Sequence, residues 1–364
     1  MNFYQITPRD PVIARDGRPF GNGLRMRSLN WFYPSVITGA FRTLYGKQKN
    51  FDFKDENKIA ELKKIIVRGP LPALDNKIYF PRPLDCIKNK EKNKLYVSRP
   101  ETINQDEGTD LPDGIIPCML QNAEDNFKPG KISAFWNSDL MFEWLFNTGI
   151  PSNFSLSEEK TLDFPEQDIR THIKMKMNEN VAEEGMLFQT TGLDFNVKDK
   201  NCKLRIAVSA SEKIEPGIDT LGGERRIVYW ENSDNDKQWQ CPDNVRNALK
   251  NSKKIRMVAA TPALFENGWK PGWINKDLTG CPPGSDVKLK LVSAVVDRWM
   301  PVSGWSYETN RPKGIRRLVP VGSVYFFEVI GGNAENLSSL WLQSVCDQEQ
   351  YRNDGFGLVV WGIY

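Results

Sequence analysis

The sequence predicts an α+β fold, in which helices cover antiparallel sheets, and three observations lead to this class. Hydrophobic residues make up 40% of the 364 residues, which is enough for a packed core and too much for a disordered chain. Most of the ordered stretches are short and strand-like, and some alternate apolar and polar side chains with a period of two. Only a few stretches show the helical period, and a chain of this length favours two domains or one large one.

The first half of the chain begins with an expected strand over residues 2–15 and a helix over 34–46. Pro34 suits the first turn of that helix and Gly46 stops it, while apolar residues between them recur at helical spacing. Three further segments are expected: a short helix over 56–67, an insertion rich in proline and charge over 68–133, and a helix over 138–149 that begins with a serine cap.

A β-hairpin is expected over residues 170–191. The stretch RTHIKMKM alternates strictly, so that Ile173, Met175 and Met177 face one way. NENVAEEG supplies the turn and MLFQT the returning strand. The opposite face of the first strand carries Arg170, His172, Lys174 and Lys176.

The rest of the chain reads as strand, connection, strands, helix and strand, which suits a ferredoxin-like unit. The helix is expected over 336–350, and the final strand follows the glycine turn of GFGLVVWGIY. A polar region over 231–254 is the candidate boundary. We therefore expect an N-terminal domain over 1–240, with the insertion and the hairpin, and a C-terminal domain over 241–364.

The overall composition excludes several classes of function. The net charge of +3 is weakly basic, so a nucleic-acid surface must be a local concentration of charge. His172 is the only histidine, which excludes H-E-x-x-H metalloproteases, and the six cysteines lack zinc-site spacing. No P-loop, secretory signal or long apolar run occurs. We expect a soluble, cytoplasmic protein without a metal or a cofactor and without a membrane partner.

The N-terminal 46 residues concentrate arginine and glycine. They hold six arginines, two aspartates and no lysine, a net charge of +4. The arginine fork binds phosphate or a base edge through two hydrogen bonds, and glycine lets the backbone approach a ligand. The alternative is that Arg–Asp pairs simply brace a turn. The candidate RNA-binding residues here are Arg15, Gly17, Arg18, Gly21, Gly23, Arg25, Arg27 and Arg42.

The cationic face of the hairpin is a second candidate. Its four side chains, Arg170, His172, Lys174 and Lys176, span about 20 Å, or roughly three to four phosphates of a single strand. The alternative is a solvated face of an amphipathic hairpin. His172 alone is also a candidate acid or base for RNA cleavage, although a lone histidine is more often structural.

Two glycine turns and one aromatic stretch complete the candidates. A phosphate can bind to glycine-turn amides, and a base can stack on an aromatic ring, although each turn is also explained as a tight connection. Trp299, Trp305 and Tyr307 alternate with arginines in 297–320, which suits RNA, a partner protein or core packing. The two turns contribute Gly222, Gly223, Arg225, Arg226, Gly355, Phe356 and Gly357.

Five motifs occur in an order that resembles one family. They are RDPVIARDGRPFGNG, WFYPSVITGAFRTLYG, HIKMKMNENVAEEGMLFQTTGLDF, LGGERR and GFGLVVWG. The chain resembles the RAMP subunits that cap the crRNA 5′ handle in type III-B (Cmr) CRISPR effector complexes. The resemblance spans nearly the whole chain, and its most specific part is the N-terminal motif.

The resemblance implies two ferredoxin-like (RRM-like) RAMP domains with glycine-rich loops. It implies binding of the crRNA 5′ handle beside a large polymerase/cyclase-like subunit and backbone RAMP subunits, with target RNA met only indirectly. By position, Arg15, Arg18 and their neighbouring glycines match the N-terminal motif, and His172 matches the start of the hairpin region. The four glycines of the two later turns match the glycine-rich loops.

Three hypotheses follow. The first is a non-catalytic RNA-binding assembly subunit. The second is a crRNA-processing endoribonuclease of the RAMP type that uses His172 as acid or base. The third is a scaffold whose RNA contacts come from neighbouring subunits.

Overall fold

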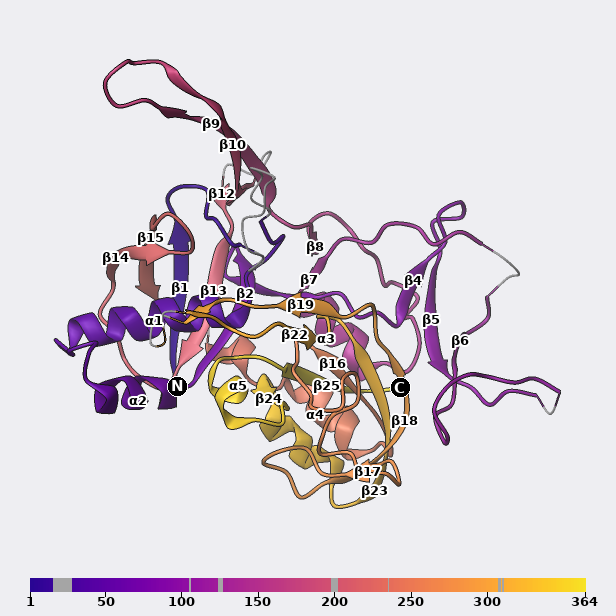
Figure 1. Ribbon diagram of the computed structural model, residues 1–364. Helices are drawn as coiled ribbons and strands as arrows, with labels where there is room; N and C mark the ends of the chain where they lie inside the picture. The colour runs from indigo at the N-terminus through magenta and orange to yellow at the C-terminus, as the bar shows by residue number, and fades with distance from the viewer. Residues whose placement is uncertain are drawn as a thin grey trace.

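The chain forms two main sheets that pack side by side, with helices on their faces and three projecting parts (Figure 1). The structure is a computed structural model, and it describes residues 1–15, 28–104, 106–123, 127–197, 202–234, 236–306, 309 and 311–364. Over these residues, no helix has both the length and the apolar character that a bilayer crossing requires. The expected mixture of helices and antiparallel strands is confirmed.

The first sheet has eight strands in the order β14-β15-β1-β13-β2-β3-β7-β8. The helices α1 (Pro34–Gln48) and α2 (Glu56–Lys64) accompany it, and α1 buries Ile37 and Phe41 in the same core as Trp230. The strands are β1 (Asn2–Pro8), β2 (Val67–Leu74), β3 (Lys77–Pro81), β7 (Phe135–Asn137), β8 (Thr161–Leu162), β13 (Arg205–Ala210), β14 (Gly217–Leu221) and β15 (Arg226–Asn232).

The second sheet has six strands in the order β17-β18-β23-β16-β25-β24. Its strands are β16 (Lys254–Ala259), β17 (Thr279–Gly280), β18 (Lys288–Val295), β23 (Val324–Gly331), β24 (Gln343–Ser344) and β25 (Leu358–Ile363). The helical segments near it are α3 (Ser138–Phe146), η1 (Asp236–Trp239), α4 (Asp243–Lys250), η2 (Ala334–Leu340) and α5 (Glu349–Asn353).

Four strands of each sheet lie in the same spatial order. In the first sheet this order is β15-β1-β13-β2 and in the second it is β25-β16-β23-β18, so that each reads fourth, first, third, second along the chain. We interpret both sheets as ferredoxin-like on this basis. The connections between these strands differ between the two sheets. In the first sheet, β14 takes the place of the second helix that a ferredoxin-like unit has. In the second sheet, an irregular segment over 260–287 follows β16.

Helix α3 belongs to the first half of the sequence but packs on the second sheet. Its Met141 and Leu145 are fully buried in the core that also contains Trp361. A Cβ added to Gly362 would lie 2.5 Å from the Leu145 carbonyl oxygen, so that β25 and α3 touch through backbone. The two halves therefore share a core, and the domain boundary at residue 240 stays a prediction.

Three parts extend from this body. The hairpin of β9 (Glu166–Met175) and β10 (Ala182–Asp194) projects freely (Figure 1). Within the insertion, β4 (Cys86–Lys88), β5 (Leu95–Pro100) and β6 (Cys118–Leu120) form a separate sheet. A ribbon over 297–318 contains β19 (Met300–Val302), β20 (Trp305–Ser306), β21 (Arg311–Pro312) and β22 (Arg316–Leu318). A short pair, β11 (Asn196–Val197) with β12 (Cys202–Lys203), follows the hairpin.

Three details of the expected helices were wrong. The helix expected over 336–350 is the 3₁₀ segment η2, then β24 and the short α5, because Leu342 N–H donates to the Val359 carbonyl and pulls the backbone to β25. The cap of α3 is Asn137, whose side chain accepts from Leu140 N–H, and the helix ends at Phe146. Gly46 lies inside the last turn of α1, beside Phe53.

Candidate nucleic-acid interface

The backbone that follows β1 joins two parts of the fold that are far apart in sequence. Val12 exchanges backbone hydrogen bonds of 3.0 and 2.8 Å with Leu193, at the base of the hairpin. Ile13 accepts a 2.8 Å hydrogen bond from Gly223 N–H, in the turn between β14 and β15. Arg15 and Ser28 pair as an antiparallel bridge. The N-terminal motif, the base of the hairpin and the GGERR turn therefore meet at one place, which we call the N-terminal joint.

Most of the arginine-glycine motif falls beyond the part of the chain that the structure describes. Arg15 is exposed at the edge of the N-terminal joint. Ser28 lies there as well, because it pairs with Arg15 and the neighbouring Leu29 N–H donates to the Ala14 carbonyl. Gly17, Arg18, Gly21, Gly23, Arg25 and Arg27 lie outside the described residues, and their proposed RNA contacts stay predictions.

Packing within the protein requires glycine at position 222. Gly222 has φ +71°, and an added Cβ would lie 2.4 Å from the Ile13 carbonyl oxygen. A Cβ on Gly223 would lie 3.0 Å from Ile13 Cγ2, and one on Gly192 would lie 2.8 Å from Pro11. The glycine turn is therefore pressed against residues 12–13, which fixes the position of the turn that carries Arg225.

Arg225 is the exposed cation of this turn. Glu224 and Arg225 both have positive φ, 57° and 51°, and Arg226 forms an ion pair of 2.6 Å with Glu224. Arg225 makes no hydrogen bond or ion pair with any residue in the described ranges. A free guanidinium in an exposed turn is suited to a phosphate, because its fork can bind two oxygens at once.

The hairpin alternates as predicted, but its charged face is neutralised. Register pairs Ile173 with Leu187 on one face and His172 with Phe188 on the other. The whole hairpin, residues 166–194, carries three basic and six acidic residues, a net charge of −3. The expected cationic track for phosphates stays a prediction, and the structure weakens it, because each cation has an acidic partner: Arg170–Asp168 at 2.7 Å, Lys174–Glu183 at 2.8 Å and Lys176–Glu179 at 3.2 Å.

His172 is held by its neighbours across the hairpin. Its Nε2 lies 2.9 Å from Thr190 Oγ1, and its ring stacks on Phe188 at 5.2 Å between centroids. No cluster of three His, Cys, Asp or Glu side chains with metal-binding geometry occurs where the structure describes the chain. The contacts of His172 are those of a cross-strand pair rather than of an acid or base with a polarising partner.

The second glycine turn is an internal joint. Phe356 is only 3% exposed and packs against Tyr351, so that it presents no ring for a base. A Cβ on Gly355 would lie 2.7 Å from the Val67 carbonyl oxygen, and one on Gly357 would lie 2.5 Å from Cys346 Sγ. The expected RNA contacts of Gly355, Phe356 and Gly357 were wrong for this conformation, because this turn packs the second sheet against β2.

Arg42 also serves the fold. Its guanidinium lies 2.7 Å from the Asp354 carboxylate and donates to the carbonyls of Lys63 (3.0 Å) and Ile65 (2.8 Å). Burial lowers the pKa of Arg42, and Asp354 opposes that shift. Only 13% of the side chain is exposed. Arg42 therefore fastens α1 to the turn before β25, and its expected RNA contact is not available here.

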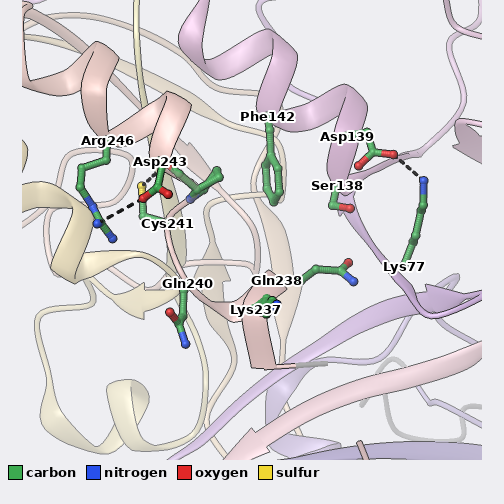
Figure 2. Close-up of a pocket in the computed structure, with 11 residues that line it drawn as sticks. Lys77, Ser138, Asp139, Phe142, Lys237, Gln238, Gln240, Cys241, Asp243 and Arg246 are labelled. Carbon is green, nitrogen blue, oxygen red and sulfur yellow. Dashed lines mark hydrogen bonds and ion pairs between the residues drawn. The ribbon is translucent and has the colours of Figure 1, made fainter. Parts of the chain in front are cut away.

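A cavity of about 540 Å³ lies between the two halves. Figure 2 shows Lys77 pointing to Asp139, Arg246 joined to Asp243 beside Cys241, and Gln238 near the middle. Lys77 pairs with Asp139, and Arg246 lies 3.4 Å from Asp243. Gln238 accepts from Ile78 N–H at 2.6 Å and donates to the Asn76 carbonyl at 2.7 Å. Lys77, Asp139, Gln238, Asp243 and Arg246 therefore already have protein partners in this cavity.

The thiols of Cys241 and Cys346 are expected to be inert at neutral pH. Burial raises the pKa of each to about 12. At pH 8, iodoacetamide should modify the exposed Cys281 and leave these two unmodified, as peptide mass spectrometry would show. Because the unfolded thiol ionises near pH 9 and the folded thiol does not, stability should fall between pH 9 and pH 12, by up to about 1.4 kcal/mol per pH unit and thiol. A C346A variant that loses stability as steeply as the parent would contradict this assignment.

A family model described as CRISPR-associated protein (Cas_Cmr3) matches residues 4–364. The chain belongs to this family. The curated proteins contain no match. Among solved structures, two titled "Cryo-EM structure of the Type III-B Cmr-beta bound to cognate target RNA", one of them with AMPPnP in state 1, contain a similar chain. In both cases the TM-score is 0.50, the identity is 14%, and the match covers 89% of this chain and 86% of the other. At this identity the likeness shows a shared fold.

One basic surface of this member of the Cas_Cmr3 family was a candidate from the sequence, but its residues were not among the expected RNA-binding residues. The ribbon over 297–318 exposes five basic side chains, and none of them forms an ion pair with an acid in the described parts of the chain. The interleaved tryptophans and arginines pointed to this segment, but periodicity gave no sign that its charges lack partners. The five residues are Arg298, Arg311, Lys313, Arg316 and Arg317.

Proposed function

We propose that this chain is a non-catalytic RNA-binding subunit of a type III-B (Cmr) CRISPR effector complex and that it binds the 5′ handle of crRNA at the N-terminal joint. The pairing of Ile13 with Gly223 carries the proposal, because it brings the turn that contains Arg225 to the backbone two residues before Arg15. The family match over residues 4–364 supports the assignment to a Cmr complex.

The chemistry of the N-terminal joint suits a bent single strand. The guanidinium fork of the exposed Arg225 can bind a phosphate through a pair of hydrogen bonds, and the turn at Gly222 is exposed as well. An unstacked handle base can stack on an arginine face. In the assembled complex, the chain would bridge the large polymerase/cyclase-like subunit to the backbone RAMP subunits, with target RNA met only indirectly.

The enzyme alternative has no observation in its favour. A crRNA-processing endoribonuclease would need His172 to act as acid or base, and His172 is engaged by Thr190 and Phe188. Incubation of repeat RNA with the purified chain and with His172→Ala tests this directly. Metal-independent cleavage that disappears in the variant would overturn the non-catalytic assignment.

Arg225→Ala should weaken binding of a synthetic RNA that carries the 5′ handle by about tenfold, because a charge-assisted fork to phosphate is lost. The slope of log K against log salt should become shallower by about 0.7 for each lost phosphate contact. Arg225→Lys should recover the salt slope but only part of the affinity, since lysine keeps the charge and loses the fork. Fluorescence anisotropy over a salt series measures both quantities.

Arg246→Ala is the matched control for Arg225→Ala. Arg246 is also partly exposed but pairs with Asp243 on α4, beside the cavity of Figure 2. Its replacement should leave handle binding unchanged. Equal affinity of the Arg225→Ala variant and the parent would remove the turn from the RNA surface, and the scaffold hypothesis would then be the better account.

A further inference from the structure

The ribbon over 297–318 borders a second cavity, with a volume of about 550 Å³. Ile115, Val296 and Val319 contribute apolar walls from the insertion, the end of β18 and the segment after β22. Trp299 and Arg317 also line it. This size lies within the range of small-ligand sites, which is roughly 300–1,000 Å³, and the apolar walls suit a flat aromatic group.

The lining of this cavity includes an aromatic ring and a guanidinium that already face each other. Trp299 is 48% exposed, and the Arg317 guanidinium carbon lies 4.7 Å from the centroid of its ring. The antiparallel pairing of β19 with β22 sets Pro301 opposite Arg317, which holds this geometry on a paired ribbon. Both faces of such a pair are suited to stacking against a nucleobase.

The charge of the ribbon favours a polyanion as its occupant. Its five basic side chains are exposed and unpaired in the described ranges, whereas every cation of the β9–β10 hairpin has an acid partner. The guanidinium of Arg316 lies over the ring of Tyr351 and donates a hydrogen bond to the tyrosine hydroxyl. No carboxylate takes part in this contact, so the positive charge of Arg316 is not neutralised. Asp297 lines the cavity and accepts only from the Arg298 backbone N–H, at 2.6 Å.

The ribbon also lies near the N-terminal joint. Tyr33 donates a 2.9 Å hydrogen bond from its hydroxyl to the Pro301 carbonyl. Ser28, at the N-terminal joint, precedes Tyr33 by five residues, so their Cα atoms are at most about 18 Å apart. One single-stranded nucleic acid can therefore contact both surfaces.

We infer that the ribbon and its cavity form a second binding site for single-stranded RNA, in which one unstacked nucleobase enters the cavity against Trp299 and the flanking phosphates lie along the ribbon cations. This site goes beyond the proposed handle contacts at residues 12–15 and 222–226. The occupant is RNA rather than a protein segment, because unpaired cations and an aromatic–arginine pair coincide with a base-sized apolar cavity.

The test measures the affinity of the purified chain for handle RNA and for an unrelated single-stranded RNA of equal length, by fluorescence anisotropy over a salt series. Trp299→Ala should weaken binding by about tenfold with an unchanged salt slope, and Trp299→Tyr should recover most of the loss. The double variant Arg311→Glu with Lys313→Glu should weaken binding more than tenfold and flatten the salt slope. Cross-links from 4-thiouridine RNA should map to residues 298–317.

Matched controls separate this site from the N-terminal joint. Ile315→Ala removes an even more exposed apolar side chain from the ribbon, and Lys250→Glu reverses an exposed charge at the end of α4; both should leave the affinity unchanged. If the ribbon variants lose affinity for the unrelated RNA as well as for handle RNA, the ribbon is a general single-strand site. If they lose affinity for handle RNA alone, the ribbon binds the handle.

The outcomes distinguish the two proposals. Wild-type affinity in both ribbon variants, together with loss of assembly with the purified Cmr subunits, would overturn the RNA assignment and make the ribbon a protein contact. An effect of Trp299→Ala without an effect of Arg225→Ala would retain the ribbon site and reject the handle surface. The reverse pattern would reject the ribbon site alone.

Discussion

Asp85→Asn should lower the free energy of unfolding by about 3–5 kcal/mol, because it leaves two buried guanidinium groups without their counter-charge. The Asp85 carboxylate is fully buried and lies 2.6 Å from Arg99 and 2.7 Å from Arg256. Its other oxygen accepts from Trp144 Nε1 at 3.0 Å. Burial lowers the pKa of Arg256 to about 10, and Asp85 opposes that shift. Urea denaturation measures the loss.

The exposed pair of Asp139 with Lys77 provides the control for Asp85. Asp139→Asn removes the same charge, but its side chain is 61% exposed, so the loss should stay within about 1 kcal/mol. Equal losses in the two variants would show that burial of the network does not matter. The network joins Arg99 of β5 to Arg256 of β16, so charge docks the β4–β5–β6 sheet on the second sheet, whereas β2 and β3 of the expected insertion over 68–133 are strands of the first sheet.

Gly222→Val should weaken binding of handle RNA by about tenfold or more and also destabilise the fold. The backbone conformation at φ +71° costs a residue with a side chain about 1–2 kcal/mol. The new Cβ would lie 2.4 Å from the Ile13 carbonyl oxygen, so that either the turn or residues 12–13 must move. This displacement would move the turn that carries Arg225 away from residues 12–13. Anisotropy titration and thermal unfolding of one preparation give both values.

Gly217→Val is the matched control for Gly222→Val. Gly217 begins the same strand, β14, and a Cβ there would meet no atom within 4 Å. It should bind handle RNA as the parent does. A Gly222→Val variant that retains full affinity would show that the contact between the turn and Ile13 does not position the RNA surface.

The local spacing of apolar residues predicted the elements in which one face of the helix or strand differs in polarity from the other. The helix over 34–46 was expected from its apolar spacing and appears as α1, and the hairpin appears where strict alternation placed it. The helix expected over 336–350 was wrong although Leu337 and Leu340 are buried at the expected spacing. Its backbone is bound to β25 instead, and no local pattern reveals that competing partner.

The composition of the sequence predicted the candidate RNA-binding residues, but packing in the fold leaves some of them exposed and buries or pairs the others. The two glycine turns looked equivalent in sequence, yet Gly222 lies in an exposed turn beside Arg15 and Gly355 is buried against Val67. The basic residues of the hairpin and of the ribbon also looked alike. Acidic neighbours neutralise the first set, and the second set remains unpaired.

The sequence by itself determined the family, the mixed class of the fold and the concentration of arginine near the N-terminus. These properties depend on residue identity and on short-range spacing. Only the tertiary structure decided which cations are free, which glycines press against other backbone and which aromatic rings are exposed. Such properties depend on contacts between residues as distant as Ile13 and Gly223, and on the burial that accompanies them.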